Sequence, residues 1–570
     1  MSNTAGLKKP VSVYITWASH DELSDNVPLT EELAMKQFEA LLFLKNHGVK
    51  FDYFLLDMFW FDKHEGFRKF RKEYWPNGPD RWLLACKENG IKPGLWITTN
   101  ITGWTTDPWM LARPEWKDSA GGRLDLVMSL HYGDFLKYHI DTMQMWVDRG
   151  IQMFKFDFAD FTAATSVTRK LYTPDELIQK NEDAWFDALK EFRHKNPDVV
   201  LLAYNGYGGD SADTFPEFKK TVKLKWLEVF DSLYCGDPRP ADVPCHNFWR
   251  AKDIYSDHMV RQYTFNGVPM KRIDNTAFMI GTTGTCYYRK KQAWKGMLLL
   301  SAARGGWMNT YYGNLDLLDE DDAKWFAKIQ NMYYDLQQFG QFSCFGNIPG
   351  TGNPYGFVAE NNAGTLLTFV NPSQKFKTIE MPQTEFKEKL LMFCDNGYSP
   401  VLTENSITLG PEQMALVGTG KYADRSYFLG IQNDVVIPEE ITPLEVDVKL
   451  PAQNRATITV NYTSKNDLRI IFSQKTTEGR PLRISGGSPP DGVSMGNLLS
   501  INVFQDKRQI PLKINYDKQI WSGLSWAVAE IENKNFKKEK PLIIQYTVTD
   551  PQKRECVIEG KVYEVKYKQT

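Results

Sequence analysis

The feature that most constrains this sequence is a repeated alternation of short apolar runs with longer amphipathic stretches between residues 11 and about 335. Such runs are typical of buried strands, and the amphipathic stretches are typical of helices that cover them. Eight apolar runs predict an α/β protein with a (β/α)8 TIM barrel, a fold that tolerates long insertions. The predicted strands are VSVYITW (11–17), FDYFLLDMFWF (51–61), IKPGLWITTN (91–100), MFKFDF (153–158), DVVLLAYN (198–205), LEVFDSLY (227–234), AFMIGTT (277–283) and GWMNTYY (306–312).

An open, doubly wound sheet is the alternative arrangement of alternating strands and helices. No GxGxxG or GxxxxGK[ST] motif follows an early predicted strand, so the usual phosphate-binding turns of such sheets are absent. The sequence therefore favours the barrel.

Beyond residue 340 the pattern changes to short alternating strands separated by turn residues, as in GTLLTFVNPS (364–373). This pattern is typical of antiparallel β-sandwiches. The Pro- and Glu-containing segment VIPEEITPLEV (436–446) separates two such regions. We expect a catalytic barrel over residues 1–338, a C-terminal β-sandwich domain over 339–424 and a second β-sandwich-like module over 425–570.

Charge and hydropathy exclude several classes of partner. Lys and Arg total 68 against 70 for Asp and Glu, so no global basic field favours nucleic acid or an anionic membrane. No apolar run approaches the about 20 residues of a membrane helix, and we expect a soluble protein. The start, MSNTAGLKKP, lacks the apolar core of a signal peptide, but a removed export signal would leave no trace. A secreted or periplasmic location therefore stays open, as does the oligomeric state.

Polar residues that end the predicted strands are the candidates for chemistry, because barrel enzymes react at the carboxyl ends of their strands. In MFKFDF, Lys155 and Asp157 alternate, so an ammonium and a carboxylate share one side of a strand. A neighbouring ammonium favours the ionised carboxylate, which can attack a sugar anomeric carbon. A barrel-lining ion pair explains the spacing equally well. The other strand-end candidates are Trp17, Asp57, Trp96, Asp160, Tyr204, Asn205 and Asp231.

Glycoside chemistry also needs an acid that protonates the leaving oxygen. The Pro-rich segment GDPRPADVPCHNFWRAKDIYSDH (236–258) supplies Asp237, Asp242, Asp253 and Asp257. Long irregular loops in compact domains are usually functional. An Arg/Asp network that merely fastens this loop is the competing interpretation.

Four motifs together resemble the melibiase-type glycoside hydrolases of clan D, which contain the alpha-galactosidases of families 27 and 36. FLLDMFWF resembles the strand that ends in two acidic residues and Trp, and IKPGLW resembles a second strand of that family. FKFDF resembles the strand that bears the nucleophile, and WRAKDI resembles the segment that bears the general acid/base. Their order and approximate spacing agree over residues 11–420. The resemblance implies a barrel with an appended β-sandwich.

The resemblance implies a retaining, exo-acting α-glycosidase that acts on a glycoside or oligosaccharide, with Asp157 as nucleophile and Asp253 as general acid/base. Asp257, which follows a serine as in family 36, is the rival acid/base. The resemblance implies no metal and no cofactor, and the acidic run DEDD (319–322) is better explained as complementing a helix N-terminus. The predicted substrate-binding residues are Trp17, Asp57, Trp60, Trp96, Lys155, Tyr204 and Arg250.

Departures from the family pattern keep the sugar open. Met58 stands where the family has the second acid of the pair that holds the galactose O4 and O6 hydroxyls, and Ala159 stands where Cys or Asn is usual. The segment from Arg250 to Asp253 is one residue shorter than the common pattern. An α-galactosidase is the principal expectation. An α-N-acetylgalactosaminidase, a β-L-arabinopyranosidase and a non-catalytic carbohydrate-binding barrel are the alternatives.

Overall fold

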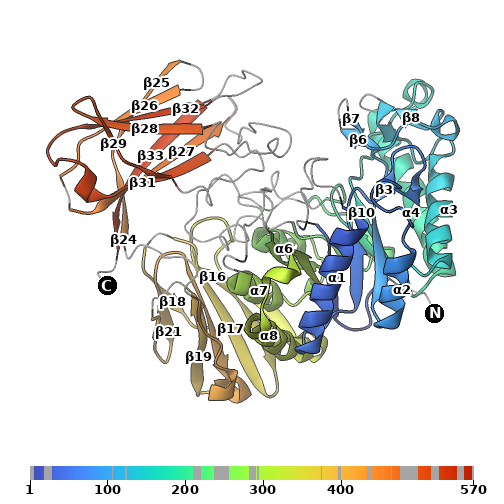
Figure 1. The fold of residues 1–570 in the computed structure, drawn as a ribbon. Coiled ribbons are helices and arrows are strands. Elements are labelled where there is room, and N and C mark those ends of the chain that lie inside the picture. The colour runs from blue at the N-terminus through green and yellow to red at the C-terminus, as the bar shows by residue number, and fades with distance from the viewer. Residues whose placement is uncertain are drawn as a thin grey trace.

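The computed structural model describes the barrel and both β-rich regions that follow it (Figure 1). The described residues are 5–17, 19, 29–104, 107–121, 125–208, 218, 220–236, 256–281, 291, 294–373, 375–395, 399–432, 440–452, 455–463, 465–475, 499–514, 526–548 and 557–567. Two residues of the predicted site, Arg250 and Asp253, lie outside this set.

Eight parallel strands form the first sheet, in the order β12-β11-β10-β5-β2-β1-β14-β13. A parallel bridge between Leu233 and Ile273 links its two outer members, so the sheet closes on itself. The predicted (β/α)8 barrel is confirmed, and each predicted strand overlaps one strand of this sheet. The strands are β1 (Val11–Ile15), β2 (Tyr53–Leu56), β5 (Lys92–Thr98), β10 (Met153–Asp157), β11 (Val200–Ala203), β12 (Ser232–Leu233), β13 (Asp274–Ile280) and β14 (Met308–Gly313).

Helices connect the barrel strands, and local capping signals set where several of them begin. Thr30 accepts a hydrogen bond from the Leu33 amide at the start of α1. Asp319 and Asp322 form a capping box at the start of α8, so the DEDD run complements a helix N-terminus as predicted. Figure 1 shows α1, α2 and α8 outside the barrel strands. The helices are α1 (Glu31–Asn46), α2 (Asp80–Glu88), α3 (Phe135–Asp148), α4 (Pro174–Lys195), α6 (Ser256–Phe265), α7 (Trp294–Ala303) and α8 (Glu320–Phe339).

Short strand pairs follow β2 and β5, on the side of the barrel where those strands end. They are β3 (Phe61–Asp62) with β4 (Gly66–Phe70), β6 (Gly103–Trp104) with β7 (Asp107–Pro108), and β8 (Ala120–Gly121) with β9 (Val127–Met128). Aromatic residues make up 14% of the chain, and many of them fill the barrel core. Fully buried tryptophans there are Trp60, Trp75, Trp82, Trp96, Trp116, Trp146, Trp185, Trp226 and Trp294.

The first β-rich region packs one sheet against the barrel and a second sheet against the first. On β17 (Gly364–Asn371), Leu366 and Val370 join the barrel core, whereas Leu367 and Phe369 join the core between the two sheets. This double burial explains the continuous apolar run of the strand. The larger sheet contains β15 (Gln341–Gly346), β16 (Tyr355–Asn361), β17, β22 (Gln413–Thr419), β19 (Lys389–Asp395) and β23 (Gly430–Gln432); the smaller contains β18 (Lys377–Glu380), β21 (Ser406–Leu409) and β20 (Val401–Leu402).

β23 pairs with β19 in parallel, so residues 430–432 add a strand to the larger sheet of the first β-rich region. A three-residue strand is too short to show alternation in the sequence.

The last region has its own apolar core, built around residues such as Ile458, Phe472 and Ile544. Its two five-stranded sheets agree with the predicted sandwich-like pattern. One sheet contains β24 (Glu440–Leu444), β33 (Val557–Lys566), β27 (Asp467–Lys475), β31 (Trp526–Ile531) and β30 (Lys513–Ile514); the other contains β25 (Asp447–Ala452), β26 (Arg455–Val460), β32 (Leu542–Val548), β28 (Leu499–Gln505) and β29 (Arg508–Ile510). Within the described part of the chain, no helix combines the length and apolarity needed to cross a lipid bilayer.

Candidate active site

The candidate site is built around Asp157, the last residue of β10. Four N–H groups donate to its carboxylate: the Trp96 indole to Oδ2 at 3.1 Å, and the Phe158 amide, the Asn205 amide and the Asn205 side chain to Oδ1 at 2.9, 3.2 and 2.8 Å. Phe158 has a φ of 51°, so the chain turns sharply where the strand ends. Asp157 is 6% exposed, and the four donors hold its carboxylate in one orientation.

Lys155 lies two residues earlier on the same strand and forms a buried ion pair with Asp57, which directly follows β2. The Lys155 Nζ donates to Asp57 Oδ2 at 2.8 Å, and the Met58 amide donates to the other carboxylate oxygen at 2.9 Å. Burial raises the pKa of Asp57 above its ordinary value, while the Lys155 ammonium opposes that rise. Lys155, Asp57 and Asp157 thus lie together at the ends of β2 and β10.

Aromatic rings surround the Lys155 ammonium. Its Nζ lies 4.1 Å from the ring centroid of Tyr204, 5.8 Å from that of Tyr312 and 6.0 Å from that of Trp17. Trp17 is the partly exposed member of this group. The ammonium is therefore paired with the Asp57 carboxylate within a group of aromatic rings, which suits a cation that is oriented rather than solvated.

Trp96 and Trp60 are more enclosed than residues that line an open pocket. Trp96 is 1% exposed, and its indole N–H is used on Asp157. Trp60 is fully buried, donates to the Trp96 carbonyl oxygen at 2.9 Å and packs against Phe70. A substrate has no accessible surface of Trp60 to contact in this conformation. The indole of Trp60 instead supports the strand that carries Trp96.

The two predicted acid/base residues lie in different circumstances. Asp253 falls outside the described residues, as does Arg250. Asp257 is fully buried in the first turn of α6, where the Tyr355 hydroxyl donates to its Oδ2 at 2.8 Å and Arg304 lies 3.6 Å from its Oδ1. Tyr355 belongs to β16 of the first β-rich region. Asp257 therefore takes part in the junction between that region and the barrel.

Two other strand-end candidates have structural partners. Asp160 accepts from the Thr162 amide and hydroxyl through one oxygen, which stabilises a surface turn. Asp231 pairs with Arg193 at 2.7 Å and accepts from the amides of Leu201 and Gly6.

Sequence reasoning missed two residues close to Lys155. The Tyr204 hydroxyl donates to Asp274 Oδ2 at 2.7 Å and lies 2.7 Å from the Tyr312 hydroxyl. Burial raises the pKa of Asp274 to about 6. Tyr312 ends a predicted strand and could have been selected by the strand-end criterion. Asp274 begins its strand, so that criterion excluded it.

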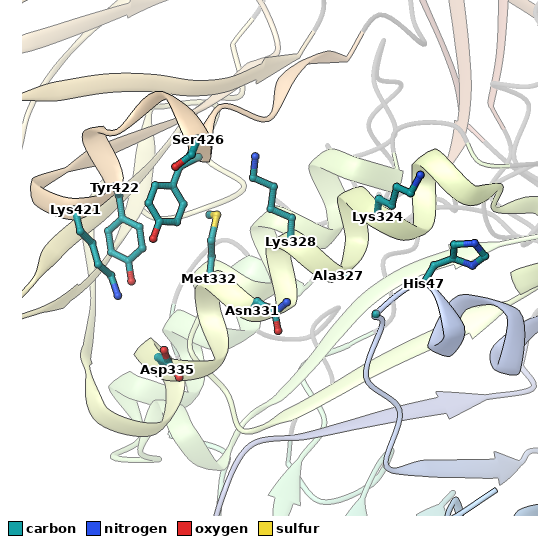
Figure 2. Close-up of a pocket in the computed structure, with 12 residues that line it drawn as sticks. His47, Lys324, Ala327, Lys328, Asn331, Met332, Asp335, Lys421, Tyr422 and Ser426 are labelled. Atoms are coloured by element: carbon teal, nitrogen blue, oxygen red, sulfur yellow. The ribbon is translucent and has the colours of Figure 1, made fainter.

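The described residues outside the Asp157 cluster contain a cavity but no set of metal ligands. No group of three or more His, Cys, Asp or Glu side chains suited to a metal occurs among the described residues. A cavity of about 500 Å³ lies between α8 and the turns at 420–427 (Figure 2). Its lining includes Lys328, Asp335 and Tyr422 but none of the Asp157 cluster.

Comparison with known proteins gives similarity of fold alone. No family model matches the sequence, and no curated protein matches it. The alpha-galactosidase of Geobacillus stearothermophilus, of family 36, is 14% identical with a TM-score of 0.49, and that of Lactobacillus brevis is 13% identical with a TM-score of 0.49. Each alignment covers 73% of this chain and 57% or 55%, respectively, of the other, so the chain spans little more than half the length of these galactosidases.

A further similar structure, the trehalose-6-phosphate hydrolase of Bacillus licheniformis, is 11% identical with a TM-score of 0.47, over 73% of this chain and 100% of that one. The barrel assignment rests on the strand pairing described above. The assignment of function rests on the residues at the ends of β2, β10 and β11.

Proposed function

We propose that the protein is a retaining exo-α-glycosidase that acts on α-galactosides. The observation that carries the proposal is the Asp157 carboxylate, which four N–H groups orient at the carboxyl end of a barrel strand beside the Lys155–Asp57 pair. A nucleophilic carboxylate has to be held in a fixed direction towards the anomeric carbon. If Lys155 and Asp57 were only a structural ion pair of the barrel, the neighbouring Asp157 carboxylate would not need four N–H donors.

In the proposed reaction an Asp157 oxygen bonds to the anomeric carbon as the glycosidic bond breaks. The acid protonates the departing oxygen at the same time. The resulting carboxylate of the acid then takes a proton from water, whose oxygen displaces Asp157 and releases the sugar with its original anomeric configuration. The two carboxyl groups in such enzymes lie about 5–5.5 Å apart.

We assign the acid/base role to Asp253 and keep Asp257 as the rival. A general acid must reach the leaving oxygen of a substrate. The complete burial of Asp257 between Arg304 and Tyr355 supports Asp253, since it gives Asp257 a role at the junction instead.

The proposed sugar contacts follow from charge and exposure. Lys155 donates one hydrogen bond among the described residues, to Asp57, and an ammonium has three donors. We propose that Lys155 and Asp57 bind sugar hydroxyls, that Trp17 forms part of the pocket wall and that Tyr204 contacts the sugar near C2. Arg250 would bind a hydroxyl near the reacting carbon. Trp96 would act by orienting Asp157, and Trp60 by supporting Trp96.

One observation favours a second sugar. Met58 replaces an acid that, in the resembled family, helps to hold the O4 and O6 hydroxyls, and its side chain cannot accept a hydrogen bond of comparable strength. A β-L-arabinopyranoside has the galactose ring configuration without the C6 hydroxymethyl group. The absence of a carboxylate at position 58 would therefore weaken the binding of this sugar less than the binding of galactose.

The test is hydrolysis of a panel of 4-nitrophenyl α- and β-glycosides by the wild type and Asp157→Asn. The panel includes α-galactoside, α-N-acetylgalactosaminide and β-L-arabinopyranoside. The proposal expects turnover of one such sugar, loss of it in the variant, and NMR detection of the retained anomer as first product. Asp160→Asn is the matched control, because Asp160 lies three residues away and its carboxylate, among the described residues, accepts from Thr162 of a surface turn.

Turnover that persists in Asp157→Asn would contradict the nucleophile assignment. An inverted first product would contradict the retaining mechanism. Binding of glycans without cleavage of any of them would establish the non-catalytic barrel instead.

A further inference from the structure

We propose that Asp274 is a positioning residue for Lys155, and that it acts through the hydroxyl and ring of Tyr204. The inference deepens the proposed function and rests on it, since Lys155 is placed there as a group that binds sugar hydroxyls. It concerns three strands, because Asp274 lies on β13, Tyr204 follows β11 and Lys155 lies on β10.

Both oxygens of Asp274 are engaged within the barrel interior. The Tyr204 hydroxyl donates to Oδ2 and the Thr310 hydroxyl donates to Oδ1, each at 2.7 Å. The Tyr312 hydroxyl lies 2.7 Å from that of Tyr204. Asp274, Thr310 and Tyr312 are each 0% exposed, so these hydrogen bonds do not compete with water.

The Tyr204 ring connects this hydrogen-bond network to the Lys155 ammonium. The Lys155 Nζ lies 4.1 Å from the ring centroid, and the Tyr234 ring stacks on the same ring with centroids 4.2 Å apart and an interplanar angle of 17°. Both partners lie too close to share one face, so the Tyr204 ring is held between them. A phenol that donates to a carboxylate gains electron density, which strengthens the attraction between its ring and an ammonium.

Asp274 thus influences the ammonium without touching it. The hydroxyls of Tyr204 and Thr310 face Asp274, the hydroxyl of Tyr312 contacts that of Tyr204, and the charges of Lys155 and Arg304 lie nearby. Burial is the largest cause of the raised pKa of Asp274, about 6, and the hydrogen bonds and positive charges oppose it. Protonation of Asp274 on acidification would weaken the hold on the Tyr204 hydroxyl and on the position of Lys155.

The experiment compares kcat/KM from pH 4.5 to 8 for the wild type, Asp274→Asn, Tyr204→Phe and the double variant. Tyr204→Phe keeps the ring beside Lys155 but removes the hydroxyl that contacts Asp274. We expect a wild-type decrease on acidification through pH 6, and its loss in both single variants. At pH 7.5 each single variant should lose about tenfold in kcat/KM, the effect of one hydrogen bond to a charged group. The double variant should lose no more than either single one.

Tyr14→Phe is the matched control. Tyr14 is a fully buried barrel tyrosine whose hydroxyl donates to the Gly313 carbonyl at 2.7 Å, and it has no part in the Lys155 surroundings. It should keep the wild-type pH profile. An unchanged profile in Asp274→Asn, or additive losses in the double variant, would overturn the proposal.

A second measurement separates failure of this inference from failure of the proposed function. Urea unfolding at pH 7.5 gives the coupling between Asp274→Asn and Lys155→Met from the two single variants and the double variant. The same cycle is then repeated with Tyr204→Phe added to the wild type, to both single variants and to the double variant. Coupling that disappears with Tyr204→Phe supports the inference even if the wild type cleaves no glycoside. Absent coupling overturns it even if the wild type is active.

Discussion

Two buried ion pairs lie in the same barrel, and they are built differently. Lys155–Asp57 and Arg193–Asp231 have similar separations, 2.8 and 2.7 Å, and all four side chains are at most 7% exposed. Arg193 also donates to the Val229 carbonyl through two nitrogens, and Asp231 accepts two backbone amides. The Lys155 ammonium, by contrast, is surrounded by aromatic rings and donates one hydrogen bond among the described residues.

The difference shows that burial and pairing do not by themselves identify a functional ion pair. The Arg193–Asp231 pair is bound by main-chain groups, at the Val229 carbonyl and the Leu201 amide, and links α4 to the starts of β11 and β12. The Lys155–Asp57 pair lies at the strand ends and retains donors that another molecule can use. Its place at the strand ends, together with these donors, distinguishes the pair proposed to bind sugar.

Breaking each pair in turn should give the largest effects. Lys155→Met should lower kcat/KM about a hundredfold, because charge-assisted hydrogen bonds to the substrate are lost. Arg193→Met should leave kcat/KM per folded molecule unchanged but lower the free energy of unfolding by about 3–5 kcal/mol, since it leaves a buried carboxylate unpaired. Glycoside kinetics and urea unfolding measure the two quantities. A change in kcat/KM with Arg193→Met would contradict the proposal that the Arg193–Asp231 pair is structural and the Lys155–Asp57 pair binds sugar.

The orientation of Asp157 gives the next largest effect. Trp96→Phe removes one N–H donor to its carboxylate while keeping an aromatic ring, and should lower kcat about tenfold. Trp82→Phe is the control, because Trp82 is also fully buried but its indole nitrogen has no hydrogen-bond partner among the described residues. Equal losses of activity in both variants would mean that packing, rather than the hydrogen bond, is responsible.

The two acid/base candidates can be separated by their response to azide. Asp253→Asn should lose more activity on glycosides with poor leaving groups than on 4-nitrophenyl glycosides, and azide should restore turnover. Asp257→Asn should show no azide rescue, and should lower the free energy of unfolding by about 1–3 kcal/mol through its contacts with Tyr355 and Arg304. Azide rescue of Asp257→Asn would reverse the assignment.

The last prediction is a pH dependence of stability. The pKa of Asp274 is raised to about 6 by folding, so the folded chain holds a proton that the unfolded chain releases between about pH 4 and 6. The wild type should therefore lose up to about 3 kcal/mol of stability from this group as the pH rises through that window. Asp274→Asn lacks the titration, so its stability relative to the wild type should increase from pH 4.5 to 7 in urea unfolding. A constant difference would contradict the raised pKa.

Local periodicity predicted much of the barrel and the grouping of Lys155, Asp57 and Asp157, because both depend on alternation within short strands and on the common edge of a parallel sheet. It could not place Trp60. Phe59 has a φ of 74°, so the chain leaves the strand direction and alternation no longer holds for the next residue. It also could not find Asp274, whose relation to Tyr204 depends on the closure of the barrel across β11, β13 and β14.

The bridge between Leu233 and Ile273 gives the barrel wall a preferred line of opening. β12 contains two residues, and among the described residues one bridge joins it to the start of β13. Parting the wall along this seam costs fewer inter-strand hydrogen bonds than separating β1 from β14, which pair over five residues. The seam lies two strands from β10 in the sheet order. Transient opening of the barrel wall would therefore begin close to the strand that carries Asp157. Amide hydrogens along β12 would exchange with solvent before those of β1.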